Sequence, residues 1–158
     1  MTSARSCGWA NSWLTLCMVF WLLPGLVQAE DRPPLNESKP FAEKFLLLQL
    51  SDAEEAKQGM VLSVAANLLE HYGPDSIDIE ITTFGPGVRL LYADNSNLEM
   101  INSLMAQGVR FSVCMNTINT IARNSGKRPD LHPESIKVAV GVAHIMDMVG
   151  RGYTLLRP

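Results

Sequence analysis

The segment Lys44-Phe-Leu-Leu-Leu-Gln-Leu50 is a short, continuous apolar run. A run of this length and composition predicts a strand that is buried on both faces, as is typical of a parallel sheet. Ser51-Asp52 follows directly, with Glu54 and Glu55 three residues after each, which is the spacing of a capping box. Helical spacing of apolar residues then continues to Gly73-Pro74, where we expect the helix to end.

The rest of the chain repeats this alternation of strand and helix. In the next strand Ile77, Ile79 and Ile81 face one way, and Asp78 and Glu80 face the other. Alternation implies right-handed crossovers and a mainly parallel sheet that is covered on both faces. We therefore predict a single three-layer α/β/α domain over 44–158 with a five-stranded, mainly parallel sheet. Further strands are expected over 76–84, 109–113, 135–140 and 153–156, and further helices over 95–107, 115–124 and 141–149.

Residues 1–29 have the parts of a secretory signal peptide. Arg5 is the only charge before Glu30, the run 13–23 is almost wholly apolar, and Val27-Gln-Ala29 fits a signal peptidase site. We predict cleavage after Ala29, export to the periplasm or beyond, and no membrane segment after cleavage. The rival interpretation is an uncleaved anchor, but the apolar run is shorter than the ~20 residues that a bilayer needs.

The composition limits the classes of partner. Acidic residues outnumber basic ones, 16 to 13, and the formal net charge is −3, so a nucleic-acid partner is disfavoured. Residues 30–43 are polar and contain three prolines, which predicts a flexible leader before the domain.

The signal peptide would remove two of the three cysteines. Cys7 and Cys17 lie within it, and neither stands where a lipidated cysteine would follow the cut. Cys114 is then alone and has no partner for an internal disulfide. It is a buried inert thiol, half of an intermolecular bridge, or a reactive thiol.

The candidate site lies where strands end, because ligands of open α/β sheets bind at the carboxyl ends of the strands. Cys114 closes one predicted strand and opens a helix, whose free N–H groups and dipole favour a thiolate. Simple packing of this side chain in the core is the alternative. Six further residues are candidates for holding a ligand: Asn116 and Thr117 after Cys114, Ser51 and Asp52 after the first strand, and Gly85 and Gly87 after the second.

Other kinds of site have weaker support. The three histidines have no metal-ligand spacing, and a site that joins His132 to Cys114 has no further support, so we expect no metal. Arg110 and three later basic residues are near Cys114 in sequence and suggest a rim that attracts anions, although a solvated surface is the more usual explanation of such a cluster. We expect no cofactor, because the chain lacks a cofactor motif and a C-x-x-C pair.

The segment Val109-Arg-Phe-Ser-Val-Cys-Met-Asn-Thr117 resembles the exported branch of the DsrE/DsrF-like sulfur-metabolism family, which has a YchN-like fold. The likeness extends to Ile136-Lys-Val-Ala-Val140 and to Gly152-Tyr-Thr-Leu-Leu-Arg-Pro158, and it covers the chain from about Phe45 onward.

This resemblance implies a small α/β/α domain that assembles as a homo-oligomer, usually a trimer or hexamer. It also implies a cysteine that carries sulfur as a persulfide between a donor and an acceptor protein, and Cys114 is the matching position. From the sequence we therefore expect a sulfur carrier. The alternative is a non-catalytic oligomer of the same fold that binds a small ligand or acts as an adaptor. A small redox enzyme is the least favoured reading.

Overall fold

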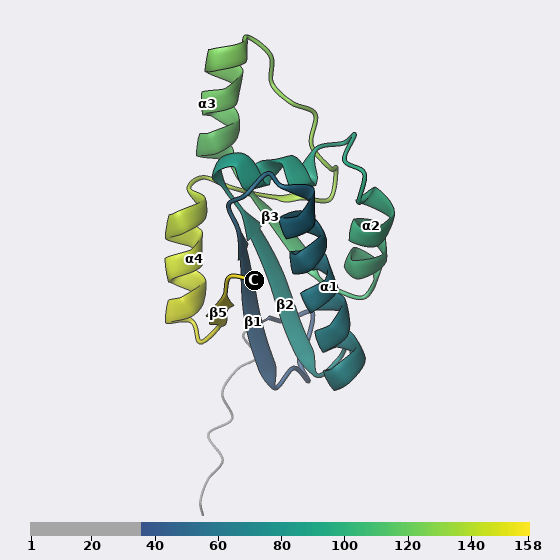
Figure 1. Ribbon diagram of the computed structural model, residues 1–158. Helices are drawn as coiled ribbons and strands as arrows, with labels where there is room; N and C mark the ends of the chain where they lie inside the picture. Colours follow the sequence, from purple (N-terminus) through teal and green to yellow (C-terminus); the bar gives the residue numbers. More distant parts are fainter. Residues whose placement is uncertain (1–35) are drawn as a thin grey trace, which may run out of the picture. The chain divides into compact units, whose positions relative to one another are not determined.

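Five strands form one sheet in the order β4-β3-β2-β1-β5 (Figure 1). The structure is a computed structural model that describes residues 36–158, so the predicted signal peptide and residues 30–35 lie outside the described part. The elements in chain order are β1 (Lys44–Leu50), α1 (Glu55–Tyr72), β2 (Ile77–Thr83), the 3₁₀ helix η1 (Gly85–Leu91), α2 (Leu98–Ala106), β3 (Arg110–Cys114), α3 (Met115–Ser125), β4 (Ile136–Val138), α4 (Gly141–Gly150) and β5 (Thr154–Leu156).

All four strand pairings are parallel, so the predicted α/β/α domain with a five-stranded sheet is confirmed. The strand order also explains how the helices are distributed. The chain moves from β1 to β4 in one direction and then returns across the sheet to place β5 beside β1. Right-handed crossovers put α1 and α2 on one face, and the reversed step puts α4 on the other (Figure 1).

Each face of the sheet has its own apolar core. The larger one packs the odd-numbered isoleucines of β2 against α1, α2 and η1, and the smaller one packs Leu47 of β1 against Ile145 and Met148 of α4. All seven residues of β2 are buried, which places Asp78 and Glu80 inside the protein under α4. The strand alternates as predicted, but neither of its faces meets water.

The predicted capping box is wrong. Helix α1 begins at Glu55, and its N-cap residue, Glu54, makes no side-chain cap hydrogen bond. Ser51 and Asp52 belong to the turn before the helix, where Arg157 donates hydrogen bonds to both side chains. The two side chains that local spacing assigned to the cap therefore bind Arg157 instead of the helix N-terminus.

The described part of the predicted leader, residues 36–43, is attached to the domain. Asn36 donates to the carboxylate of Asp78, and Lys39 Nζ donates to the backbone oxygens of Pro74, Ile77 and Gln107. These bonds hold the segment against the ends of β2 and α2. None of the helices within residues 36–158 has the length and apolar character needed to cross a membrane.

Candidate functional site

Cys114 is the last residue of β3 and the N-cap residue of α3. The alternation of β3 turns Arg110, Ser112 and Cys114 toward the α4 side of the sheet, while Phe111 and Val113 enter the larger core. Only 4% of Cys114 is exposed. The sequence placed this residue correctly at the junction of a strand and a helix, and the structure adds that it is buried.

A second helix also begins at the Cys114 sulfur. Gly141 opens α4, and its backbone N–H donates a hydrogen bond to Cys114 Sγ over 3.2 Å. A Cβ atom at Gly141 would lie 3.1 Å from Cys114 Cβ and 3.1 Å from Phe84 Cβ, so this approach is tight even for glycine. The N-termini of α3 and α4 thus converge on one sulfur atom, and both helix dipoles favour a negative charge there.

The surroundings of Cys114 shift the pKa of its thiol in opposing directions. Burial raises the pKa, whereas hydrogen bonds from the Thr117 side chain and from the backbone N–H groups of Gly141, Thr117 and Asn116 lower it. The hydrogen bonds prevail, and the thiol pKa lies below its ordinary value. Gly85 N–H donates to Thr117 Oγ1 over 3.1 Å, which leaves the Thr117 hydroxyl proton free to point at the sulfur.

Beside Cys114 lies a shallow, mainly apolar pocket of about 390 Å³, lined by Gly85, Pro86, Asn116, Thr117, Thr120 and Ile121. Four of the predicted site residues therefore gather at one place: Cys114, Asn116, Thr117 and Gly85. Asn116 lines this pocket and is exposed. Thr117 faces the sulfur as well as the pocket.

Gly87 and Gly85 allow the close packing and the backbone conformation of the loop after β2. A Cβ atom at Gly87 would lie 2.3 Å from the Leu50 backbone oxygen, so this position requires glycine for packing. Gly85 has a φ of +52°, in the left-handed region that favours glycine. Its N–H group donates to Thr117 Oγ1, so the loop after β2 helps to hold Thr117 beside Cys114.

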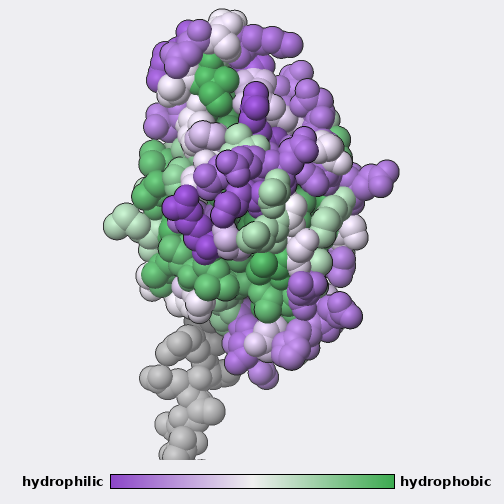
Figure 2. All heavy atoms as spheres, viewed as in Figure 1, coloured by the Kyte–Doolittle hydropathy of each residue, from purple (hydrophilic) through white to green (hydrophobic). Residues whose placement is uncertain are grey.

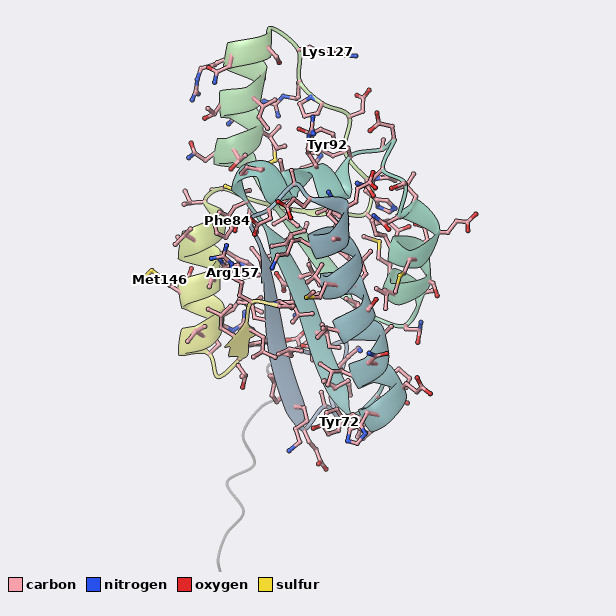
Figure 3. All side chains as sticks on the ribbon, viewed as in Figure 1. Tyr72, Phe84, Tyr92, Lys127, Met146 and Arg157 are labelled. Atoms are coloured by element: carbon pink, nitrogen blue, oxygen red, sulfur yellow. The ribbon has the colours of Figure 1, made fainter. Side chains whose placement is uncertain are left out.

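The side chains of Ser51 and Asp52 do not join this group, although the Ser51 backbone borders the loop after β2, where a Cβ atom at Gly85 would lie 3.8 Å from Ser51 O. They follow β1, and β2 separates β1 from β3 in the sheet. Their side chains are engaged with Arg157, whose Nη2 atom lies 3.1 Å from Ser51 Oγ and 3.3 Å from Asp52 Oδ2. In Figure 3 the labelled Arg157 lies between α4 and β1. The structure therefore does not bring these two predicted residues to Cys114.

A charged network beneath α4 was not predicted from the sequence. Arg110 Nη1 lies 2.6 Å from Asp78 Oδ1, and Arg110 also binds Glu80 Oε2 at 3.1 Å. Tyr153 donates to Asp78 Oδ2, and burial together with this carboxylate raises the pKa of Tyr153 to about 12. The Arg110 guanidinium is therefore engaged by buried carboxylates, and the prediction that this residue belongs to an anion-attracting rim is wrong. Acidic residues inside a buried strand were the available signal.

His132 also lies away from the site. Its ring Nε2 is 2.8 Å from Asn102 Oδ1 in α2, and its backbone N–H donates to Leu91 O. Among residues 36–158, no group of three or more His, Cys, Asp or Glu side chains is placed to hold a metal ion.

Comparisons with known proteins give a likeness to a solved structure. No model of a known family matches the sequence, and no curated protein matches it. Among solved structures, the chain is similar to MTH1491 from Methanobacterium thermoautotrophicum, a protein whose function is described as unknown. The two share 28% identity with a TM-score of 0.65, over 73% of this chain and 100% of that one. The likeness supports the fold and leaves the chemistry to be argued from the site.

Proposed function

We propose that this protein is an exported sulfur carrier of the DsrE-like kind, which holds sulfane sulfur as a persulfide on Cys114. The observation that carries the proposal is the Cys114 sulfur itself, set at the N-termini of two helices with a lowered thiol pKa. The resemblance of residues 109–117 to that family supports it.

Export rests on residues 1–29, and N-terminal sequencing of the exported protein, which should begin at Glu30, tests it.

The proposed cycle has two thiol-exchange steps and no net redox change. The Cys114 thiolate attacks the outer sulfur of a donor persulfide, R–S–SH. A new S–S bond forms on Cys114, the donor S–S bond breaks, and R–S⁻ leaves with the electron pair. The thiolate of an acceptor protein then attacks the outer sulfur on Cys114, and Cys114 leaves as the thiolate. One cysteine suffices, because the resolving thiol belongs to the partner.

Incubation with polysulfide, followed by mass spectrometry of the intact protein, should show a mass increase of one sulfur atom. The adduct should disappear in Cys114→Ser, since serine cannot form a persulfide, and it should be released by a small thiol. A protein that takes up no sulfur from polysulfide, thiosulfate or a low-molecular-weight persulfide would refute the carrier function.

The alternative is a non-catalytic oligomer that binds a small ligand or acts as an adaptor. The burial of Cys114 favours it, because a thiol that is 4% exposed also suits a purely structural role. This function predicts that Cys114→Ala leaves ligand binding and assembly intact and that the thiol reacts slowly with alkylating reagents.

We further propose that the chain assembles as a trimer or hexamer. The outer surface of α4 and the two edge strands carry exposed apolar side chains, of which Met146 is 70% exposed. Figure 2 shows apolar side chains on the side of the molecule where Figure 1 places α4, and Figure 3 shows Met146 pointing away from the sheet. An exposed apolar surface of this kind is typical of an interface. The exposed set is Ile136, Val140, Val142, Met146, Val149, Leu155 and Leu156.

Light scattering after size exclusion should therefore give the mass of a trimer or hexamer. Met146→Asp should shift the population toward monomer, because it buries a charge in the contact. Ser63→Asp, on an exposed position of α1, is the matched control and should leave the mass unchanged. A wild-type protein that is monomeric at micromolar concentration would contradict the assembly.

A further inference from the structure

Helix α4 covers its face of the sheet alone, and in the described part of the chain two hydrogen bonds join it to the sheet. One is the bond from Gly141 N–H to Cys114 Sγ. The other joins His144 Nε2 to Glu80 Oε1 at 2.5 Å. Because an ionised carboxylate only accepts hydrogen bonds, the imidazole N–H of His144 is the donor. The remaining contacts of α4 with the sheet are apolar, through Ile145 and Met148.

These two bonds lie on the same face of the helix. Gly141 and His144 are three residues apart, which is close to one helical turn. Apolar contacts stabilise the packing but are not directional, so by themselves they leave a helix free to slide or rotate by small amounts. A short hydrogen bond to a fixed carboxylate restricts both movements, because its strength depends on distance and angle.

The carboxylate of Glu80 is itself fixed. Its Oε2 atom accepts hydrogen bonds from Arg110, whose Nη1 atom is held by Asp78. Tyr153 and Asn36 donate to the remaining oxygen of Asp78. Glu80 is 3% exposed, so its Oε1 atom is presented to α4 in one orientation by partners on β2 and β3. The charged network therefore gives α4 a rigid anchor.

We propose that the contact between Glu80 and His144 is a positioning device, which holds the first turn of α4 where Gly141 N–H reaches the Cys114 sulfur. His144 is thus a positioning residue: it acts on the sulfur through the helix and does not touch it. The inference concerns the same sulfur atom as the proposed function. It predicts how the thiol titrates whether or not sulfur is ever transferred.

The experiment follows alkylation of Cys114 by iodoacetamide across pH, in protein where Cys114 is the only cysteine. In His144→Ala the midpoint of the profile should move upward, so that the thiolate fraction below the wild-type midpoint falls about threefold. His144→Gln retains a side-chain N–H toward Glu80 and should restore most of the wild-type profile. Ala143→Ser, a change at an exposed position of the same helix outside the proposed interface set, should leave the profile unchanged.

A second readout follows the backbone amide of Gly141 by NMR. Its resonance should move as Cys114 titrates in the wild type and in Ala143→Ser, because the amide is bonded to the sulfur. In His144→Ala this response should be reduced. Gly141 is bonded to the sulfur and not to the charged network. Loss of the His144 side chain can therefore reduce the response of the Gly141 amide only by moving α4.

An alkylation profile of folded His144→Ala that matches the profile of Ala143→Ser would overturn the proposal. If circular dichroism shows that His144→Ala is unfolded, His144→Leu decides the question, because leucine has a similar volume but no donor. An unchanged midpoint in His144→Leu would equally refute the positioning role. Since no sulfur donor is present in these assays, their failure is distinct from the failure of persulfide formation.

Discussion

Arg110→Ala should lower the free energy of unfolding by about 3–5 kcal/mol, the cost of leaving buried charges without their partner. Asp78 is fully buried and Glu80 is 3% exposed, and Arg110 is the cation that both carboxylates share. Tyr153 and His144 would still donate hydrogen bonds to them, but neither supplies a permanent positive charge.

Urea unfolding at pH 7.5 measures this effect. Arg110→Lys should recover part of the loss, because lysine keeps the charge but lacks the planar fork that binds two carboxylates together. Arg128→Ala is the matched control: it removes an exposed arginine that donates to Asn119, and it should change stability by about 0.5 kcal/mol or less.

A loss below 1 kcal/mol in Arg110→Ala would contradict this account. It would mean that the hydrogen bonds from Tyr153, Asn36 and His144 are enough to keep the two carboxylates inside the protein. The rigid anchor for α4 would then not depend on a charge.

Gly141→Ala should lower the thiolate fraction of Cys114 about tenfold at pH values below the wild-type midpoint. The new Cβ would meet Cys114 Cβ and Phe84 Cβ at 3.1 Å, and relief of this contact moves the first turn of α4 away from the sulfur. A hydrogen bond to a charged group contributes about 1.5–3 kcal/mol, and about 1.4 kcal/mol corresponds to a tenfold change in the equilibrium between thiol and thiolate. Alkylation across pH measures the change.

Gly59→Ala is the control for this substitution. Gly59 lies inside α1, and a Cβ atom there would meet nothing within 4 Å, so the thiol should titrate as in the wild type. A Gly141→Ala protein whose thiol titrates like the Gly59→Ala protein would show that the N–H bond from α4 does not stabilise the thiolate.

The same bond makes stability depend on pH. The thiol pKa of Cys114 is lower in the folded chain than its ordinary value, so the folded state loses the proton first. The folded state therefore gains stability as the pH rises through the folded pKa. The gain is complete above the unfolded pKa of about 8.5. It is lost again as the pH falls, and it should be smaller in Gly141→Ala.

Local patterns in the sequence were enough to place the elements. The strand Lys44–Leu50 was predicted to the residue, because an apolar run ended by Ser-Asp has clear limits. Helix α2 begins at Leu98, later than the predicted 95, because Asn95 accepts from the backbone N–H of Asn97 and forms a turn there. Helix α3 ends before Gly126, whose φ of 74° suits glycine.

The candidate site was predicted only in part. Residues that are close together in the sequence were placed together correctly, and contacts between distant residues were not predicted. Cys114, Asn116 and Thr117 are neighbours in sequence, so one strand–helix junction places all three. Ser51 and Asp52 were grouped with them because all follow strand ends, but the strand order sets them apart. Gly141 was missed: it is 27 residues from Cys114, and no local pattern reports that its N–H reaches the sulfur.

The sequence by itself determined the alternation of strand and helix, the three-layer fold and the place of Cys114 at a strand end, because periodicity and turn residues act over a few neighbours. The tertiary structure alone decided that β5 lies beside β1 and that α4 crosses the opposite face. That crossing brings Gly141 to Cys114 and His144 to Glu80. Such contacts join residues far apart in the chain, and only the packing of the whole domain selects them.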